Sequence, residues 1–453
     1  MARKYRGLPT IVGTAVERLV SELASLLSGE ESVEEREDQL GQALNEVGRA
    51  AMEQMLGSED PGGADIEVSG KSYWQALRSE REYMSSFGPI RVERGMYRHV
   101  RNGPTICPVE HRAGIVESFW TPRAAKLAAL AVTDMTPYRA SQFFETLGGM
   151  QPSRSSFDRL PKALSRRWET HREEFERVVR EQDEIPHEAT AVAVSMDGVM
   201  LPMRDGCKHD KKARTRARGR PDKGPAGYRE VGCGAISYYD ARGNRLKTVR
   251  SARMPESKMP TLRESLRSEL TYIRAQRPDL TVVAVADGDH VQWEFLDSLN
   301  PDESVVDFYH AAEHLKRGID LTDEPSSLAT QRRFQKLRHR LKTEPNGARA
   351  VIRSLCQKKP RRTSESAGYR RGINYFKRHG HRMDYHRLAR RHLPIGSGVI
   401  EGTCRWIVSD RMKRTGMRWD HDGGQAILTL RALAHSDRFD VGWRLLADTY
   451  RQI

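Results

Sequence analysis

Hydrophobic positions follow a helical period at the start of the chain and a strand period further on. Over residues 9–56 apolar side chains recur every three or four positions on both sides of an acidic stretch at 30–38, which predicts a pair of helices. This pair either mediates self-association or packs on the body of the protein. Residues 59–70 have the Gly, Pro and acidic composition of a linker. Residues 88–100 alternate apolar and charged side chains, which predicts a small exposed β ribbon.

Three short helices are predicted next, at residues 122–132, 137–147 and 154–164. Serine, threonine and proline at their starts supply helix N-cap signals, and a Gly-Gly pair separates the second from the third. The spacing resembles a helix-turn-helix, whose third helix would present Arg154 and Arg159 to DNA. An ordinary three-helix packing unit has the same pattern. A charged helix over residues 166–183 is expected to follow.

Two apolar, β-branched runs that lead into Asp-Gly mark the next region. Residues 191–200 read Ala-Val-Ala-Val-Ser-Met-Asp-Gly-Val-Met, and residues 281–288 read Thr-Val-Val-Ala-Val-Ala-Asp-Gly. Each run is typical of a buried strand that carries its aspartate, Asp197 or Asp287, to the solvent-facing end. Asp-Gly is also a common turn dipeptide, so either aspartate alone has a second interpretation as a turn cap.

The remaining elements predict a mixed α/β region that an all-helical insertion interrupts. We expect a hairpin of two strands at residues 230–239 and 245–252, a helix at 260–275 and a further strand at 304–310. The last of these strands closes with Asp307 and His310. Residues 311–391 are helical in pattern and very basic, and a helix that begins near Ser397 carries Glu401.

These patterns divide the chain into seven regions. We expect a helical arm (1–58), a linker with the β ribbon (59–115), a helix-turn-helix-like region (116–185) and the first part of a mixed-sheet core (186–310). The all-α insertion (311–393), a closing core helix with Glu401 (394–435) and a C-terminal tail (436–453) are expected to follow.

Charge and cysteine content narrow the class of partner. The chain has 76 Lys+Arg against 61 Asp+Glu, a net charge of +15. Such a balance in a long chain favours nucleic acid over a membrane surface, although a merely basic cytosolic protein also has it. No apolar run approaches the ~20 residues of a membrane span. The five cysteines form no Cys-x-x-Cys pair, and His99, Cys107 and His111 are too few and wrongly spaced for zinc, so a reduced, cytosolic protein is expected.

Residues 204–223 combine many cations with Gly and Pro and have almost no apolar side chains. Such a segment cannot form core. A solvated basic loop is the plain interpretation, but its position soon after Asp197 favours an arm that contacts DNA phosphates. The cations expected to make these contacts are Lys211, Lys212, Arg214, Arg216 and Arg218.

Asp197, Asp287 and Glu401, if gathered at one edge of the sheet, would form a concentrated negative site. Two Mg²⁺ or Mn²⁺ ions would relieve the repulsion, because hard cations take oxygen ligands and also bind phosphate oxygens. In a two-metal site, one ion activates the attacking oxygen and the other stabilises the leaving oxygen of a phosphoryl displacement. The pattern therefore points to chemistry on phosphodiesters.

Residues 394–404, Pro-Ile-Gly-Ser-Gly-Val-Ile-Glu-Gly-Thr-Cys, together with the strand order and the three acidic residues, resemble a DDE transposase with a ribonuclease-H-like core. More narrowly, Gly-Ser-Gly-Val-Ile-Glu at 396–401 followed by Arg-Met-Lys-Arg-Thr-Gly-Met-Arg-Trp at 411–419 is similar to transposases of the ISKra group of bacterial insertion sequences. Asp-Phe-Tyr-His at 307–310 resembles the Cys/Asp-x-x-His element of Mutator-like and hAT transposases. The resemblance covers roughly residues 89–433.

The resemblance implies an endonuclease that cleaves DNA at transposon ends and transfers the 3′ hydroxyl to target DNA. Asp197 would bridge two metal ions, and Asp287 and Glu401 would each hold one. Asp307 and His310 would support them, although a histidine in such a position is often only structural. The implied setting is bacterial, cytoplasmic and nucleoid-associated, with a homo-oligomer assembled on double-stranded DNA.

Further DNA contacts are expected from the segment after Glu401. Its cations would contact the phosphate backbone near the scissile bond, and they are Arg411, Lys413, Arg414 and Arg418. Trp419 either stacks on an unpaired base or packs in the core. Two other functions have the same broad pattern. One is an RNA-guided nuclease, but such proteins usually carry a Cys-x-x-Cys zinc ribbon after the glutamate, and none follows Glu401. The other is a domesticated DNA-binding regulator, but the presence of all three carboxylates argues against it.

Overall fold

A computed structural model describes residues 9–204, 212, 215–217, 219 and 227–452. The chain forms two compact units, the first made of Met1–Phe175 with Arg438–Ile453 and the second of Glu176–Asp437. Helices and strands occur in both, so the chain is α/β, as the sequence predicts. Among the described residues, no helix combines the length and the apolar character that crossing a bilayer requires.

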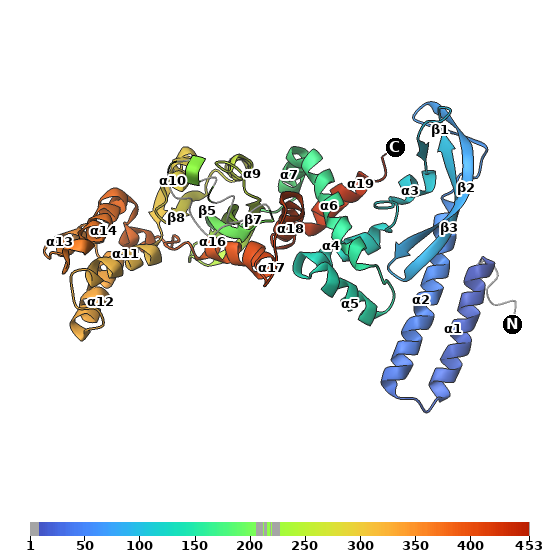
Figure 1. Cartoon of the computed structure of the whole chain (residues 1–453), viewed down its shortest axis with the longest axis horizontal. Helices are drawn as coiled ribbons and strands as arrows, with labels where there is room; N and C mark the ends of the chain where they lie inside the picture. Colours follow the sequence, from blue (N-terminus) through green and yellow to red (C-terminus); the bar gives the residue numbers. More distant parts are fainter. Residues whose placement is uncertain (1–8, 205–211, 213–214, 218, 220–226, 453) are drawn as a thin grey trace. The chain divides into compact units, whose positions relative to one another are not determined.

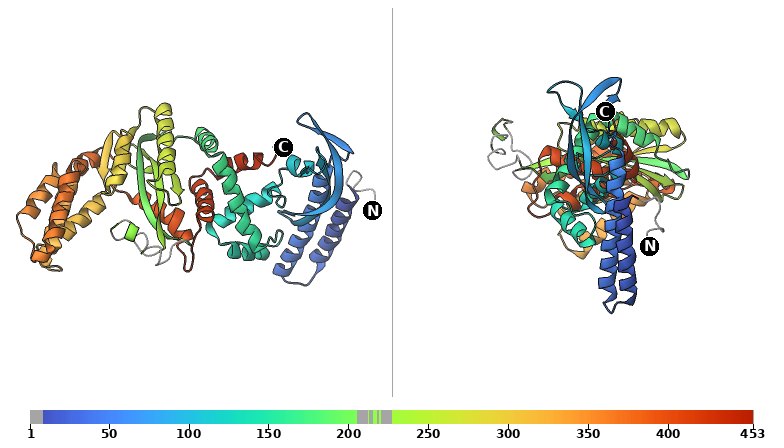
Figure 2. Two further views of the ribbon diagram at one scale, coloured as in Figure 1. Left: turned by 45° about the horizontal axis from the view of Figure 1, so that its top comes forward. Right: turned by 90° about the vertical axis from the view of Figure 1, so that its right-hand side faces the viewer.

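The first unit begins with two antiparallel helices, α1 (Thr10–Ser28) and α2 (Val33–Ser58), which lie side by side (Figures 1 and 2). Ser32 starts α2 with a capping box. Its hydroxyl accepts from the Glu35 N–H at 3.2 Å, and the Glu35 carboxylate accepts from the Ser32 N–H at 2.9 Å. The helical pair predicted from the apolar spacing is therefore present.

A four-stranded antiparallel sheet follows, in the order β1-β2-β3-β4. Its strands are Asp65–Val68, Lys71–Ser85, Gly88–Arg98 and Thr105–Ile106. The β structure predicted at 88–100 is present as β3, although it belongs to a larger sheet. The linker expected at 59–70 was wrong, since β1 lies within it. Most of β2 is solvent-exposed on both faces, which removes the alternation by which a half-buried strand is recognised.

Helices complete the first unit: α3 (Pro108–Ala113), α4 (Pro122–Asp134), α5 (Pro137–Leu147), α6 (Arg154–Thr170), α7 (Arg172–Glu181), which leads into the second unit, and α19 (Phe439–Asp448). The expected single helix over 166–183 was wrong, because α6 continues to Thr170 and α7 is separate. Residues after 438, expected as a tail, include α19, which buries Phe439 and Trp443.

The second unit contains a five-stranded mixed sheet in the order β7-β6-β5-β8-β9. The strands are β5 (Ala189–Pro202), β6 (Tyr228–Asp240), β7 (Arg245–Arg253), β8 (Thr281–Ala286) and β9 (Glu303–Val306). β5, β6 and β7 pair antiparallel, whereas β8 and β9 run parallel to β5. Apolar side chains of β5 and β8 form the centre of the unit's largest hydrophobic cluster.

Helices pack on both faces of this sheet. On one face α9 (Pro260–Gln276) approaches β6 so closely that a Cβ at Gly234 would lie 2.9 Å from the Leu266 side chain. On the other face Cys233 and Ala235 of β6 pack against residues of α16 (Gly398–Thr403), of the segment that follows it and of α18 (His421–Ala434). Glycine alternates with larger residues along β6 because the strand separates two helical layers.

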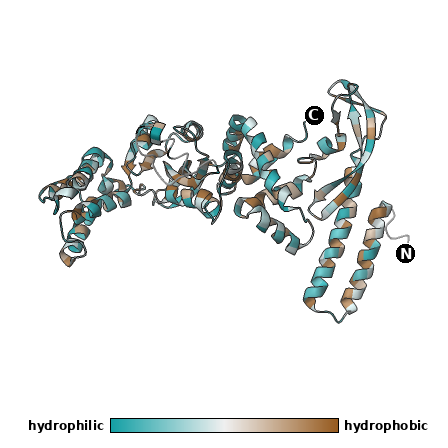
Figure 3. Cartoon of the chain, viewed as in Figure 1, coloured by the Kyte–Doolittle hydropathy of each residue, from teal (hydrophilic) through white to brown (hydrophobic). Residues whose placement is uncertain are grey.

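The stretch predicted as an all-helical insertion consists of α11 (Phe308–Asp320), α12 (Leu328–Thr343), α13 (Gly347–Cys356), α14 (Ser366–His379) and α15 (Tyr385–Arg390). Hydrophobic and hydrophilic positions alternate around these helices (Figure 3), as expected for amphipathic helices that share a core. The buried Tyr385 donates its hydroxyl to the Val306 carbonyl at 2.9 Å, which attaches α15 to the end of β9.

Candidate active site

Three aspartates share one register position across three neighbouring parallel strands. The last paired positions of β5 with β8 and of β8 with β9 are Val194↔Ala284 and Ala286↔Val306. Continuing both registers along the chain places Asp197 level with Asp287, and Asp287 level with Asp307. Because adjacent strands lie about 4.8 Å apart, the sheet itself gathers the acidic residues at the carboxyl ends of β8 and β9.

Asp197 lies within β5 and not at its end, in contrast to the expectation. β5 continues to Pro202 because it stays paired with β6, where Cys233 is the partner of Asp197. β8 has already ended at Ala286. On that side Gln292 of α10 (His290–Ser298) approaches instead, with its Nε2 3.4 Å from Asp197 Oδ1.

The half-buried Asp197 carboxylate is in an electrostatically unfavourable place. Burial raises its pKa, and the nearby Asp287 carboxylate raises the pKa further. The Gly198 N–H, which donates to Oδ1 at 2.7 Å, the Gln292 side chain and His310 lower the pKa and partly offset this. A cation bound beside the two aspartates would remove the repulsion.

Asp287 is a turn residue as well as an acidic one. Its Oδ1 accepts the N–H groups of Gly288 at 2.5 Å and Asp289 at 2.8 Å. Asp289 in turn caps α10 by accepting from the Val291 N–H at 2.8 Å. Asp287 is therefore both a turn cap and a neighbour of Asp197, because the turn fixes its carboxylate at the end of the strand.

Asp307 is fully buried and joins two helix starts. Its Oδ1 accepts the His310 N–H at 2.7 Å, and its Oδ2 accepts the Ser397 N–H. β9 ends at Val306 and Asp307 is the N-cap of α11, so His310 lies in the first turn of a helix. The expected strand over 304–310 was therefore too long by four residues at its carboxyl end.

Glu401 lies on α16 and faces the first turn of α11. Its Oε1 accepts from the Ser397 hydroxyl at 3.1 Å and lies 3.6 Å from His310 Nε2, while 56 % of its side chain is exposed. Ser397 occupies the N-cap position of α16, but its side chain caps no backbone N–H and donates to Glu401 instead. A π-helical turn, Cys404–Ser409, continues α16 into α17 (Asp410–Met412), and such turns are frequent at functional sites.

The three carboxylates do not form a closed ligand cage. Within the part of the chain that the structure describes, no three acidic, histidine or cysteine side chains are close enough to hold one ion together. Asp197 and Asp287 form the adjacent pair, and Glu401 faces His310. Their oxygen donors nevertheless fit Mg²⁺ or Mn²⁺, because such ions keep several waters and bind through one or two carboxylates plus substrate phosphates.

The predicted DNA contacts before and after this edge are mostly exposed. Lys212 and Arg216 are exposed, whereas Lys211, Arg214 and Arg218 lie outside the described residues. On α6, Arg154 and Arg159 are exposed while the apolar side of the helix is buried, which fits both the helix-turn-helix and the ordinary three-helix interpretation.

The segment after α17 only partly fits the expectation. Lys413, Arg414 and Arg418 are exposed, but Arg411 is only 2 % exposed and packs inside the unit. The Trp419 indole N–H donates to the Met412 carbonyl at 2.9 Å and the ring packs on the core, so the structure agrees with the packing interpretation of this residue. A β-bridge joins Trp419 to Met203, the residue before the basic segment at 204–223.

Tyr375 of α14 contacts the acidic edge and was not predicted. A Cβ at Gly288 would lie 2.6 Å from its Cε2 atom, so only glycine fits beside Asp287. The Tyr375 ring stacks on His314 with 3.8 Å between centroids, and its hydroxyl is buried with no hydrogen-bond partner. Burial and the charges of Asp287 and Asp307 raise its pKa. No local pattern identifies this contact, because the two positions are far apart in sequence.

Asp307→Asn tests the junction of α11 and α16. Asparagine has one carbonyl oxygen and one amino group, so one of the two N–H donors that Asp307 accepts would face another donor. We expect the free energy of unfolding to fall by about 2 kcal/mol, measured by urea denaturation. Asp422→Asn, at an exposed position of α18, is the matched control. Equal stability of the two variants would contradict the junction.

Asp197→Asn tests the electrostatic strain at the acidic edge. The folded-state pKa of Asp197 is raised, so the free energy of unfolding decreases as pH rises from the unfolded pKa through the folded one. At pH 7 in a chelator, the neutral side chain should therefore raise the thermal midpoint by a few degrees, and its Oδ1 can still accept from Gly198. Mn²⁺ should raise the midpoint of the wild type more than that of the variant. A lower thermal midpoint for the variant would contradict the electrostatic strain at Asp197. An equal shift of the midpoint by Mn²⁺ in both proteins would contradict metal binding at this residue.

Comparison with models of protein families finds no match, and a search of curated proteins finds no similar sequence. The function must therefore be inferred from the residues themselves. Those residues are the register-matched aspartates, the glutamate on α16 and the exposed cations in the same unit.

Proposed function

We propose that the chain is a DNA transposase of the DDE type, with Asp197, Asp287 and Glu401 as its acidic residues. It would cleave DNA at transposon ends and transfer the resulting 3′ hydroxyl into target DNA. The observation that carries the proposal is the shared register of Asp197 and Asp287 on adjacent parallel strands, with Glu401 on a helix that Asp307 attaches to the same edge.

The topology of the second unit supports a ribonuclease-H-like core. Three antiparallel strands are followed in sequence by two that run parallel to the first of them, in the order β7-β6-β5-β8-β9. The helical insertion enters after β9 and returns just before the glutamate helix. These features also agree with the resemblance to the ISKra group.

Two Mg²⁺ or Mn²⁺ ions, when bound at these carboxylates, would supply activation of the attacking oxygen and stabilisation of the leaving one. The chain's own residues prepare the site. Gln292 and the Gly198 N–H orient Asp197, and Ser397 and His310 hold the exposed Glu401 carboxylate. No serine or tyrosine nucleophile is required, because water or a DNA hydroxyl attacks phosphorus directly.

Double-stranded DNA is the substrate that the charge distribution supports. Lys413, Arg414 and Arg418 are exposed on the segment that follows the glutamate helix, and Lys212 and Arg216 are exposed residues of the basic segment at 204–223. A β-bridge joins Trp419 to Met203, the residue before that basic segment. Contacts from such cations release counterions and give affinity for any sequence. Assembly as a homo-oligomer on paired transposon ends is part of the same proposal.

A DNA-binding regulator without cleavage activity is the second candidate function. The observation in its favour is that the described side chains form no group of three that would hold one ion. Against it, each of the three carboxylates is held in place by specific hydrogen bonds, which a binding module does not need. The exposed α6 arginines suit both functions.

The decisive experiment is Mn²⁺-dependent cleavage of a labelled duplex that carries the ends of the element flanking the gene. We expect the wild type to leave 3′ hydroxyl ends, and Asp287→Asn and Glu401→Gln each to reduce cleavage by at least about a thousandfold. Asp422→Asn should cleave as the wild type does. Binding without cleavage under any divalent metal would replace the transposase with the regulator.

A further inference from the structure

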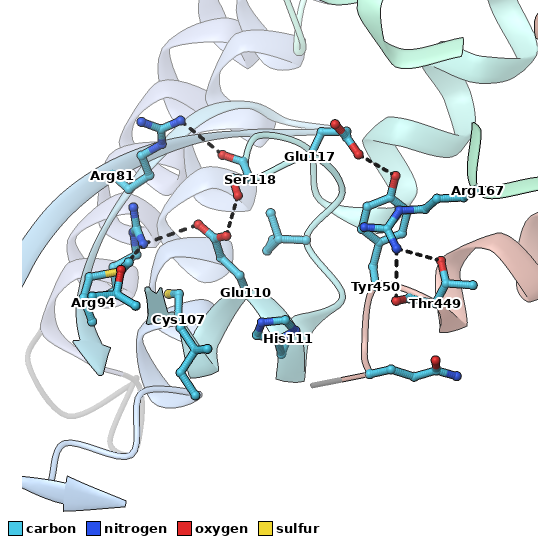
Figure 4. A pocket seen from close by; sticks show the side chains of 15 residues that line it. Arg81, Arg94, Cys107, Glu110, His111, Glu117, Ser118, Arg167, Thr449 and Tyr450 are labelled. Carbon is cyan, nitrogen blue, oxygen red and sulfur yellow. Dashed lines mark hydrogen bonds and ion pairs between the residues drawn. The ribbon is translucent and has the colours of Figure 1, made fainter. Parts of the chain in front are cut away.

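A cavity of about 650 Å³ lies within the first unit (Figure 4). Its walls come from β2, β3, β4, α3, the loop after α3, α6 and the residues that follow α19. This volume is in the range of small-molecule sites. All of these walls belong to one compact unit, so the cavity is a feature of that unit alone.

Three arginines from three different walls line the cavity, and their polar contacts are long or weak. Arg81 Nη2 lies 3.4 Å from the Ser118 carbonyl, Arg167 Nη1 lies 3.4 Å from the Thr449 carbonyl, and Arg94 Nη1 lies 3.4 Å from Glu110 Oε1. Arg94 Nη1 also lies 2.7 Å from the Met96 sulfur, which is a weak acceptor. Hydrogen bonds from a guanidinium are ordinarily about 2.7–2.9 Å long to a carboxylate and about 2.7–3.2 Å long to a carbonyl oxygen, so these guanidinium groups retain capacity to donate.

The two carboxylates of the cavity are already engaged by hydroxyl groups (Figure 4). Glu110 accepts from the Tyr83 hydroxyl at 2.9 Å and from the Ser118 hydroxyl at 2.7 Å, and Glu117 accepts from the Tyr450 hydroxyl at 2.8 Å. Burial and the adjacent glutamates raise the pKa of both tyrosines, which keeps them protonated as donors. These hydroxyl bonds take up part of the acceptor capacity of the two carboxylates, and the contact between Glu110 and Arg94 is long, at 3.4 Å.

Two further nitrogens in the cavity lining have no hydrogen-bond partner. They are Arg94 Nε and His111 Nδ1, and both are buried. Only 11 % of the Arg94 side chain is exposed. A buried polar group without a partner destabilises the fold, and such groups are rare in native proteins. The Arg94 Nε–H is thus a donor without an acceptor, whereas His111 Nδ1 is a donor or an acceptor according to its tautomer. Together with the three arginines, this lining favours a ligand that supplies acceptor oxygens.

We propose that this cavity binds a phosphate group. Donors on three walls suit a tetrahedral oxyanion, whose oxygens point in several directions, whereas a carboxylate has two oxygens in one plane. The phosphate is either free, as inorganic phosphate or a nucleotide, or it is the terminal phosphate of a DNA strand. The proposal rests on the first unit alone and stands whether or not the chain cleaves DNA.

Calorimetric titration with inorganic phosphate tests the site directly. We expect saturable binding by the wild type, about tenfold weaker binding by Arg94→Lys, which keeps the charge but loses the fork of donors, and a similar loss in Arg81→Gln. Arg91→Gln is the matched control. Arg91 is an exposed residue of β3 that pairs with Glu82 and does not line the cavity, and its replacement should change affinity less than about twofold.

A second arm distinguishes the sources of the phosphate. Oligonucleotides with a 5′ phosphate and with a 5′ hydroxyl are compared for binding to the same variants. If the wild type binds the phosphorylated strand more tightly and Arg81→Gln abolishes this difference, the site binds DNA ends. Arg81 is exposed, so its variant stays informative if Arg94→Lys does not fold. The proposal fails if neither arm shows phosphate-dependent binding, if acetate binds as tightly as phosphate, or if Arg91→Gln loses as much affinity.

Discussion

The buried carboxylate of Asp307 is the interaction on which the acidic edge depends. One oxygen accepts from the start of α11 and the other from the residue before α16, so a single side chain holds the first helix of the insertion and the helix that follows the insertion. His310 and Glu401 lie close together because Asp307 accepts hydrogen bonds from the backbone near each of them. A buried charge is tolerated there because both oxygens accept hydrogen bonds.

The sheet and the insertion contribute separately to this edge. Parallel pairing of β5, β8 and β9 brings Asp197 and Asp287 level, and burial together with the nearby Asp287 charge places Asp197 under electrostatic strain that a divalent cation would relieve. From the insertion, Tyr375 packs on Gly288 and Tyr385 bonds to the end of β9. The insertion is thereby part of the site's framework, which explains why a long helical segment can interrupt the core without separating its acidic residues.

Local sequence patterns predicted the elements that are buried or amphipathic and missed those that depend on partners distant in sequence. The strands of Asp197 and Asp287 were recognisable because continuous apolar runs are typical of strands buried on both faces. The sheet around β2 was missed because its side chains are largely exposed, so hydrogen bonding to neighbours and not burial defines it. Arg411, expected on the surface, is buried, and neither its place in the core nor the contact of Tyr375 with Gly288 leaves a periodic signal.

The most direct measurement is anomalous diffraction from crystals of the protein soaked in Mn²⁺. We expect manganese directly coordinated by the carboxylates of Asp197 and Asp287, with Glu401 turned toward the same ions. Manganese bound elsewhere, with none beside this pair of aspartates at saturating concentration, would contradict the central claim that the register-matched carboxylates form a metal-dependent catalytic site.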